Sequence, residues 1–225
     1  MLQQPARVRC KICCISSTDE VALATAHGAD ALGLVGAMPS GPGVLEDAQI
    51  AMLASNVPPA VASFLLTSET SPDKIVEHVR RVGVSTVQLV DWVGVDAYSY
   101  LRERLGAVRI VQALHVEDDG ALTQAHAVAP LVDALLLDSG RPNAPVRELG
   151  GTGRAHDWSI SAEIVRTVDC PVFLAGGLHA ENVGAAVAEV RPYAVDVCSG
   201  VRADGQLDAT RLRAFMDALR TPIKC

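Results

Sequence analysis

A cysteine near the start of the chain and an aspartate past its middle are residue types that could move protons between them. Cys13 lies at the end of the strand-like run 8–14, and Asp138 ends the apolar run 132–138. A thiolate can remove a proton as a general base, and a protonated carboxyl group can deliver one as a general acid. If two buried strands bring these residues to one rim, the sequence predicts an acid–base site there.

Two glycine-containing turns near the C-terminus could bind a phosphate group. Gly176 and Gly177 follow one apolar run, and Ser199 and Gly200 follow another. Glycine lets the backbone approach an anion closely, and backbone N–H groups at a helix N-terminus bind anions. The long loop 139–157 carries a third glycine run, Gly150-Gly151-Thr152-Gly153, from which we expect a flap that closes over a ligand.

The elements that must position these residues alternate between strand-like and helix-like about eight times. Val, Ile and Leu runs separated by helix-length segments are typical of parallel strands buried on both faces. The expected strands are 8–14, 31–35, 61–66, 86–90, 108–114, 132–138, 172–175 and 194–198. The expected helices include 18–27, 46–54, 72–82, 97–105, 119–128, 159–168 and 208–219. We therefore predict an α/β protein, a single (β/α)8 TIM barrel over residues 1–225; a doubly wound open sheet is the alternative, and the count of eight favours closure.

Barrel enzymes place their active sites at the C-terminal ends of the strands, where Cys13 and Asp138 both stand. Side chains alternate along a strand, so Lys11 shares a face with Cys13 and could place a positive charge beside the thiol. We assign Lys11 and Gln88 to substrate binding. Burial at the rim would keep the carboxyl group of Asp138 protonated. Asp196, inside a strand, is expected to be a structural hydrogen-bonding partner.

Composition limits the class of protein and its partners. The chain has 225 residues, 49% of them hydrophobic, which is enough core material for one barrel of roughly 250 residues. A net charge of -7 argues against nucleic acid, because phosphate backbones are bound by Lys and Arg, whereas a small phosphorylated sugar needs only a few N–H donors. No apolar run reaches the roughly 18 residues that span a bilayer, and residues 1–9 lack a signal-peptide core. We expect a cytoplasmic protein with no membrane partner, as a monomer or homodimer.

The six cysteines are expected to be reduced thiols. The segment Cys10-Lys11-Ile12-Cys13 spells the CxxC of zinc and redox sites, but alternation along a strand points Cys10 and Cys13 to opposite faces. No second cluster completes a metal site, so we predict no metal. We also predict no organic cofactor, because side chains alone can carry out both proton transfers. Four cysteines are interpreted as buried small hydrophobes or tail residues: Cys10, Cys14, Cys170 and Cys225. Cys198 shares a face with Asp196.

Structural interpretations compete with the chemical ones. Cys13 could be a core residue at the end of a buried strand, and Asp138 could cap the turn that follows it. Gly176 and Gly177 could be ordinary turn glycines. Of the histidines, only His115, at the end of a strand, is placed to reach the site.

Several motifs stand in register along the whole chain: Lys11-Ile12-Cys13, Ala29-Asp30-Ala31-Leu32-Gly33, Val87-Gln88-Leu89, Leu135-Leu136-Leu137-Asp138-Ser139, Gly150-Gly151-Thr152-Gly153, Asp157-Trp158, Leu174-Ala175-Gly176-Gly177-Leu178, Glu181-Asn182-Val183, Arg191-Pro192 and Val195-Asp196-Val197-Cys198-Ser199-Gly200-Val201. Together they resemble phosphoribosylanthranilate isomerase of tryptophan biosynthesis. The resemblance is most specific from Leu135 onward.

That resemblance implies an Amadori rearrangement of N-(5'-phosphoribosyl)anthranilate to 1-(2-carboxyphenylamino)-1-deoxyribulose 5-phosphate, catalysed without a cofactor. In the family, the cysteine that matches Cys13 is the general base that takes the proton from sugar C2. The aspartate that matches Asp138 is the general acid that protonates the ring oxygen. Substrate and phosphate binding are assigned to Lys11, Gln88, Gly151, Gly153, Gly176, Gly177, Ser199 and Gly200.

The chain departs from the family pattern at three positions. Cys14 stands where the family has glycine, Pro42 stands where it has an arginine that meets the anthranilate end of the substrate, and Val90 stands where it has histidine. These departures lie mainly on the aglycone side. A divergent paralogue that acts on a different phosphorylated sugar derivative is therefore one alternative, and a non-catalytic phosphate-binding barrel is another. A Schiff-base aldolase built on Lys11 is disfavoured, because the family's own lysine there forms no imine.

Overall fold

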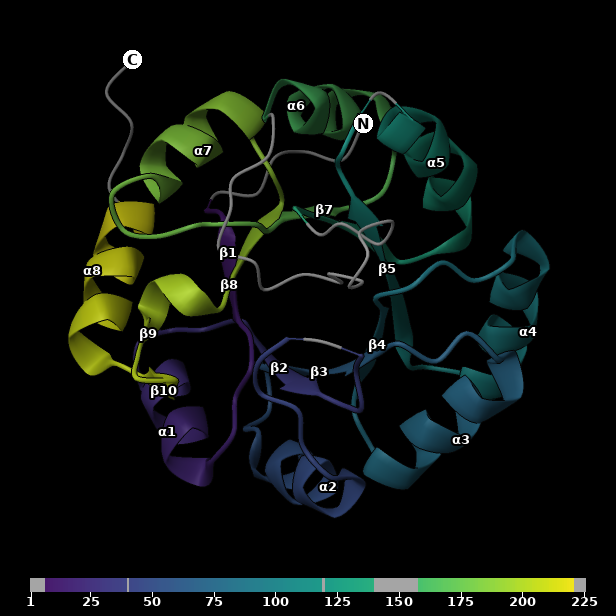
Figure 1. The fold of residues 1–225 in the computed structure, drawn as a ribbon, viewed down its shortest axis with the longest axis horizontal. Helices are drawn as coiled ribbons and strands as arrows, with labels where there is room; N and C mark the ends of the chain where they lie inside the picture. The colour runs from purple at the N-terminus through teal and green to yellow at the C-terminus, as the bar shows by residue number, and fades with distance from the viewer. Residues whose placement is uncertain (1–6, 40, 119, 140–157, 221–225) are drawn as a thin grey trace.

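Eight parallel strands close into a barrel in which each strand pairs with the next and β8 pairs with β1 (Figure 1). The computed structural model describes residues 7–39, 41–118, 120–139 and 158–220. The strands are β1 (Arg9–Ile12), β2 (Ala31–Val35), β3 (Ala62–Thr67), β4 (Thr86–Leu89), β5 (Arg109–His115), β6 (Ala134–Asp138), β7 (Val172–Leu174) and β8 (Ala194–Val197). The closed parallel sheet confirms the predicted fold class and excludes the open sheet.

Helices follow the strands in chain order and surround the barrel (Figure 1). They are α1 (Thr18–Ala26), α2 (Asp47–Asn56), α3 (Pro72–Val82), α4 (Val95–Leu105), α5 (Gly120–Val128), α6 (Trp158–Thr167), α7 (Val183–Val190) and α8 (Ala209–Arg220), with single 3₁₀ turns η1 (Ala129–Leu131) and η2 (Ser199–Val201). Within the described residues, no helix is both long and apolar enough to cross a membrane.

Local sequence signals explain where several helices begin and end. The hydroxyl of Ser17 accepts a hydrogen bond from the Glu20 N–H at 3.2 Å and so caps the start of α1. Pro72 occupies the first position of α3, where its missing N–H costs nothing, and Gly83 ends that helix in the left-handed conformation, at φ 69°. These helices lie where the sequence predicts them.

Side-chain alternation divides the apolar residues into two cores. One core fills the space between the strands and the helices and includes Cys10, Ile12 and Leu32. The other fills the barrel interior and includes Cys13 and Leu136. Cys10 and Cys13 thus lie on opposite faces of β1, as the alternation predicts.

Two local features differ from the sequence-based expectation. The strand β1 ends at Ile12 rather than at residue 14, and Cys14 takes a left-handed conformation with φ 62° that a strand cannot continue. After β8, a small hairpin of β9 (Arg202–Ala203) and β10 (Gln206–Leu207) was not expected. Its turn is Asp204-Gly205, with φ 50° and 79°, which is a strong hairpin signal that precedes α8.

Candidate active site

Cys13 stands at the C-terminal end of β1 with its side chain in the barrel interior. Its backbone N–H donates to the carbonyl oxygen of Val197 at 2.9 Å, which holds the residue beside β8. Gly33 on β2 leaves room for the thiol, because a Cβ at that position would lie only 2.9 Å from Cys13 Sγ and 3.1 Å from Lys11 Nζ. Because Gly33 has no side chain, the thiol of Cys13 and the ammonium group of Lys11 can lie side by side.

Lys11 is fully buried and forms an ion pair across the β1–β8 seam. Its Nζ donates to Asp196 Oδ1 at 2.9 Å, and Asp196 is only 8% exposed. Burial opposes the charge on Lys11, but the carboxylate of Asp196 and the thiol of Cys13 outweigh burial and raise the pKa of Lys11. Asp196 is thus the hydrogen-bonding partner that the sequence suggests, and Lys11 brings a positive charge to the barrel interior beside Cys13.

Asp138 ends β6 opposite His115 of β5. Its Oδ1 accepts a hydrogen bond from the Ser139 N–H at 2.7 Å, the turn contact expected from the structural interpretation of this residue. Burial raises the pKa of the Asp138 carboxyl group, and the Ser139 N–H and His115 only partly oppose that shift. The carboxyl group therefore stays protonated to a higher pH than an exposed aspartate, as a general acid requires.

His115, the histidine that the sequence places near the site, is held by the neighbouring strand. Its Nε2 lies 3.2 Å from the carbonyl oxygen of Val90, which makes Nε2 the donor. Val90, one of the positions that departs from the family pattern, is buried against the barrel interior. The Val90 side chain thus packs in the barrel interior, and the Val90 carbonyl oxygen orients His115 beside Asp138.

The turn after β7 takes a conformation that requires glycine. Gly176 and Gly177 have φ values of 88° and 62°, and a Cβ at Gly176 would lie 2.9 Å from Ser139 Oγ. The Asn182 side chain closes the turn, because its Nδ2 donates to the Gly177 carbonyl oxygen at 2.9 Å while its Oδ1 accepts from the His179 N–H at 2.8 Å. The turn thereby leads directly into the N-terminus of α7.

The turn after β8 packs against the turn after β7. Ser199 and Gly200 lie in η2, and a Cβ at Gly200 would collide with the carbonyl oxygen of Leu178. The structure therefore brings Gly176, Gly177, Ser199 and Gly200 to one part of the C-terminal rim, where N–H groups could bind an anion.

Gln88 lies on β4 and is 4% exposed. Its Oε1 is buried and has no hydrogen-bond partner among the residues that the structure describes. A buried amide oxygen usually has a donor, so this atom is suited to accept a hydrogen bond from a ligand. Gly151 and Gly153, with the rest of the predicted flap, lie outside the described residues.

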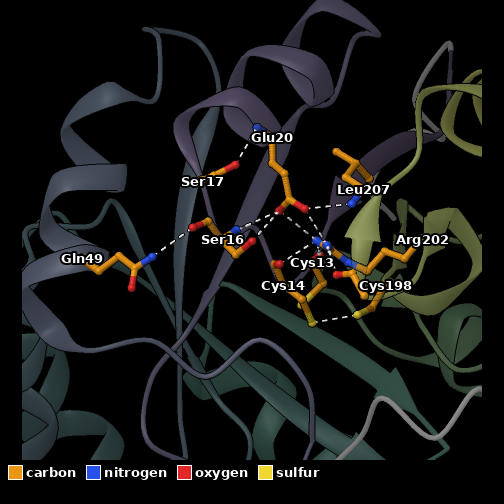
Figure 2. A network of polar contacts seen from close by, with 10 residues as sticks. Cys13, Cys14, Ser16, Ser17, Glu20, Gln49, Cys198, Arg202 and Leu207 are labelled. Carbon is orange, nitrogen blue, oxygen red and sulfur yellow. Dashed lines mark hydrogen bonds and ion pairs between the residues drawn. The ribbon is translucent and has the colours of Figure 1, made fainter.

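A cluster beside Cys13 was not predicted. Figure 2 shows the sulfur atoms of Cys14 and Cys198 facing each other. Cys198 directly follows β8, Cys14 lies just beyond β1, and their sulfur atoms are 2.7 Å apart. The contact with Cys14 and the positive charge of Arg202 lower the pKa of the Cys198 thiol. Cys14 is buried, as the sequence suggests, but no sequence pattern indicates its thiol partner or the Arg202–Glu20 pair in the same figure.

The five cysteines in the described part of the chain are free thiols. Across residues 7–39, 41–118, 120–139 and 158–220, no three His, Cys, Asp or Glu side chains are grouped so that they could hold a metal ion.

Comparisons with known proteins agree on one family. A family model for N-(5'phosphoribosyl)anthranilate (PRA) isomerase matches residues 10–218. The N-(5'-phosphoribosyl)anthranilate isomerase of Methanocella arvoryzae is 34% identical over 94% of this chain and 98% of its own length. The protein of the same name from Haloferax volcanii is 37% identical over 95% of this chain and 93% of its own length.

Solved structures show the same architecture. The phosphoribosyl anthranilate isomerase of Thermotoga maritima superposes with a TM-score of 0.82 at 28% identity, covering 95% of this chain and 98% of that one. A phosphoribosyl anthranilate isomerase in complex with reduced 1-(o-carboxyphenylamino)-1-deoxyribulose 5-phosphate superposes with a TM-score of 0.78 at 26% identity, covering 95% of this chain and 98% of that one.

Proposed function

This chain belongs to the N-(5'-phosphoribosyl)anthranilate isomerase family, and from that membership we propose that it catalyses the Amadori rearrangement of N-(5'-phosphoribosyl)anthranilate in tryptophan biosynthesis. One observation about the site supports the proposal most strongly. Cys13 lies in the barrel interior with Leu136, and Asp138 stands two residues after Leu136 at the end of β6 and so on the same face, which places the candidate base and the candidate acid in one barrel interior. The reaction needs both roles, since one proton must be delivered and another removed.

In the proposed mechanism, Asp138 and Cys13 act in sequence. Asp138 donates its proton to the ring oxygen of the ribose, and the ring opens as the anthranilate nitrogen forms an iminium with C1. The positive nitrogen acidifies the proton on C2, and Cys13 removes that proton to give an enolamine. Tautomerisation of the enolamine gives the aminoketose, as C1 gains a proton and the C2 hydroxyl loses one. These two transfers return Cys13 to the thiolate and Asp138 to the carboxylic acid, so substrate and product are isomers and the proposed steps call for neither a metal nor an organic cofactor.

The other predicted residues are assigned to binding. The turns with Gly176, Gly177, Ser199 and Gly200 would hold the phosphate group through their N–H groups, and Gly151 and Gly153 are also assigned to substrate binding. Gln88 Oε1 would accept a hydrogen bond from a sugar hydroxyl, because it lacks a donor within the described protein. Lys11 binds Asp196 and would act on the substrate through its charge.

We also propose that the enzyme is cytoplasmic and that each subunit folds as a single domain. The enzyme would be a monomer or a homodimer. The barrel and its helices run continuously from Arg9 to Arg220 apart from the residues left undescribed, which supports a single domain. Size-exclusion chromatography with light scattering would distinguish the monomer from the dimer.

A genetic complementation experiment tests the proposed pathway. The parent gene should restore growth without tryptophan to a bacterial strain that lacks this isomerase, and genes with Cys13→Ser or Asp138→Asn should not, at equal protein levels. If the folded parent protein fails to restore growth, the proposed substrate is wrong. Because Pro42 and Val90 replace family residues, a phosphorylated sugar with a different aglycone would then be the next substrate class to test.

A further inference from the structure

A buried arginine from the C-terminal part of the chain holds the backbone on which Cys13 stands. Arg202 begins β9, two residues after Gly200, and is only 8% exposed. Its Nη2 donates to the carbonyl oxygen of Cys13 at 3.0 Å and to that of Cys14 at 2.5 Å (Figure 2). One guanidinium group therefore connects the turn after β1 to the turn after β8.

Glu20 of α1 anchors this arginine from the other side. Its carboxylate accepts hydrogen bonds from Arg202 Nη1 at 2.8 Å, from the Ser16 N–H at 2.8 Å and from the Leu207 N–H at 2.8 Å (Figure 2). Burial disfavours the Glu20 carboxylate, but the bonds from Arg202, Leu207 and Ser16 outweigh burial and lower the pKa of Glu20. Both groups are therefore charged near neutral pH, and both are at least nine-tenths buried.

The turn that Arg202 holds has an unusual backbone. Cys14 has φ 62°, a left-handed conformation that few residues other than glycine adopt. Such a conformation persists only where the surrounding structure imposes it. With the two carbonyl oxygens released, Cys14 could relax to a negative φ, and the peptide that carries Cys13 would turn with it. The Arg202 guanidinium group is thus one of the contacts that hold the turn on which the Cys13 thiol stands.

We propose that Arg202, anchored by Glu20, is a positioning residue for the isomerisation: it fixes the Cys13–Cys14 turn relative to the Ser199-Gly200 turn and so sets the distance between the base and the bound substrate. This inference rests on the proposed function, because it takes Cys13 as the base and the turn after β8 as a phosphate site. Arg202 acts through the backbone of Cys13 and does not itself contact the reacting atoms.

Substitution of Arg202 tests the proposal through kcat. A misplacement of about 1 Å can cost about 100-fold in rate, so we expect Arg202→Met to lower kcat by about that factor. KM should change little, because the Ser199-Gly200 turn packs through its backbone against Leu178 and not against the Arg202 side chain. Arg202→Lys should recover part of kcat, because the lysine ammonium group keeps the positive charge. The recovery should be incomplete, because an ammonium group cannot donate to the two carbonyl oxygens and to Glu20 in one plane. A purely structural role would lower stability and leave the kcat of the folded protein unchanged.

A second variant covers the case in which Arg202→Met does not fold. Removing one partner of a buried ion pair leaves the other charge unpaired, whereas Glu20→Gln combined with Arg202→Gln removes both charges. This double variant should fold and still show the loss of kcat, because the glutamine side chain is too short to replace the two bonds from Arg202 Nη2 to the carbonyl oxygens of Cys13 and Cys14. Circular dichroism would establish that each variant is folded at the assay temperature.

The alkylation rate of Cys13 gives a readout that does not depend on catalysis. Cys13 is 6% exposed, so iodoacetamide should modify it slowly in the parent and severalfold faster once the turn is released. Fragment-ion mass spectrometry would separate Cys13 from Cys14. If the parent shows no isomerase activity, the proposed function fails, and the alkylation rate alone then decides whether Arg202 positions Cys13.

Arg102→Met is the matched control. Arg102 Nη1 pairs with Asp133 Oδ2 at 2.6 Å, and Asp133 precedes β6 at the opposite end of the barrel from the candidate site. This control should lose stability without a change in kcat or in Cys13 alkylation. A kcat of folded Arg202→Met equal to that of the parent would overturn the proposal, and for an inactive parent an unchanged alkylation rate would do the same.

Discussion

Replacing Lys11 with methionine should destabilise the barrel strongly, because it leaves the carboxylate of Asp196 buried without its partner. Lys11 is fully buried, Asp196 is 8% exposed, and Nζ lies 2.9 Å from Oδ1. Methionine has nearly the length of the lysine side chain, so the substitution mainly removes the charge and leaves the packing in place.

The size of the effect follows from the burial of the pair. Removing one partner of a buried ion pair costs about 3–5 kcal/mol. In a chain of roughly 150–250 residues, each kcal/mol shifts Tm by about 2–4 °C, so Tm should fall by about 6–20 °C. Asp196→Asn in the Lys11→Met background removes the unpaired charge, and the coupling energy between the two substitutions should be about 1–3 kcal/mol.

Urea unfolding followed by circular dichroism measures these differences. The control is Lys74→Met, because Lys74 pairs with Glu69 at 3.8 Å on the surface, where an ion pair contributes less than about 1 kcal/mol. If Lys11→Met costs no more than Lys74→Met, or if the substitutions at Lys11 and Asp196 prove additive, the buried pair does not hold the β1–β8 seam together as we infer.

Three further predictions concern the site. If Asp138 is the general acid, kcat/KM of the parent should fall as the pH rises through the pKa of Asp138, which burial raises. The residual activity of Asp138→Asn should lack this limb of the pH profile, and a limb that survives the substitution would contradict the role. In urea unfolding, Gly200→Ala should destabilise by about 1–3 kcal/mol because the new methyl group collides with a backbone carbonyl. Gly184→Ala meets open space in α7 and should instead stabilise by about 0.4–1 kcal/mol, so equal effects of the two alanines would refute the packing of this turn. Hydrogen peroxide should join Cys14 and Cys198, whose sulfur atoms lie 2.7 Å apart: the two thiols give up two protons and two electrons, and the peroxide is reduced to water. Mass spectrometry of unreduced peptides would detect the disulfide, and two free thiols after oxidation would contradict this prediction.

The fold could be predicted from sequence because the strands are short apolar runs with polar or glycine boundaries. β2 lies at 31–35 as predicted, since Asp30 and Gly36 bound an uninterrupted apolar run. Most other boundaries differ by one or two residues. β1 ends earlier than predicted because Cys14 has a positive φ, and nothing in the residue type of Cys14 signals that conformation.

The candidate site could be predicted only in part. Cys13 and Asp138 stand at strand ends, so the rule that barrel sites lie at those ends places both residues on one rim. The Arg202–Glu20 and Cys14–Cys198 contacts join residues 182 and 184 positions apart, and they form only because β8 returns to β1. No local pattern contains that information, since it depends on the register of barrel closure and on the left-handed turn at Cys14.

Turnover of N-(5'-phosphoribosyl)anthranilate, generated in situ and followed by the loss of its fluorescence, tests the proposed activity and its two catalytic residues together. We predict turnover by the parent and its loss in Cys13→Ser and Asp138→Asn, with both variants still folded by circular dichroism. A folded parent that leaves the fluorescence unchanged, or variants as active as the parent, would contradict the assignment.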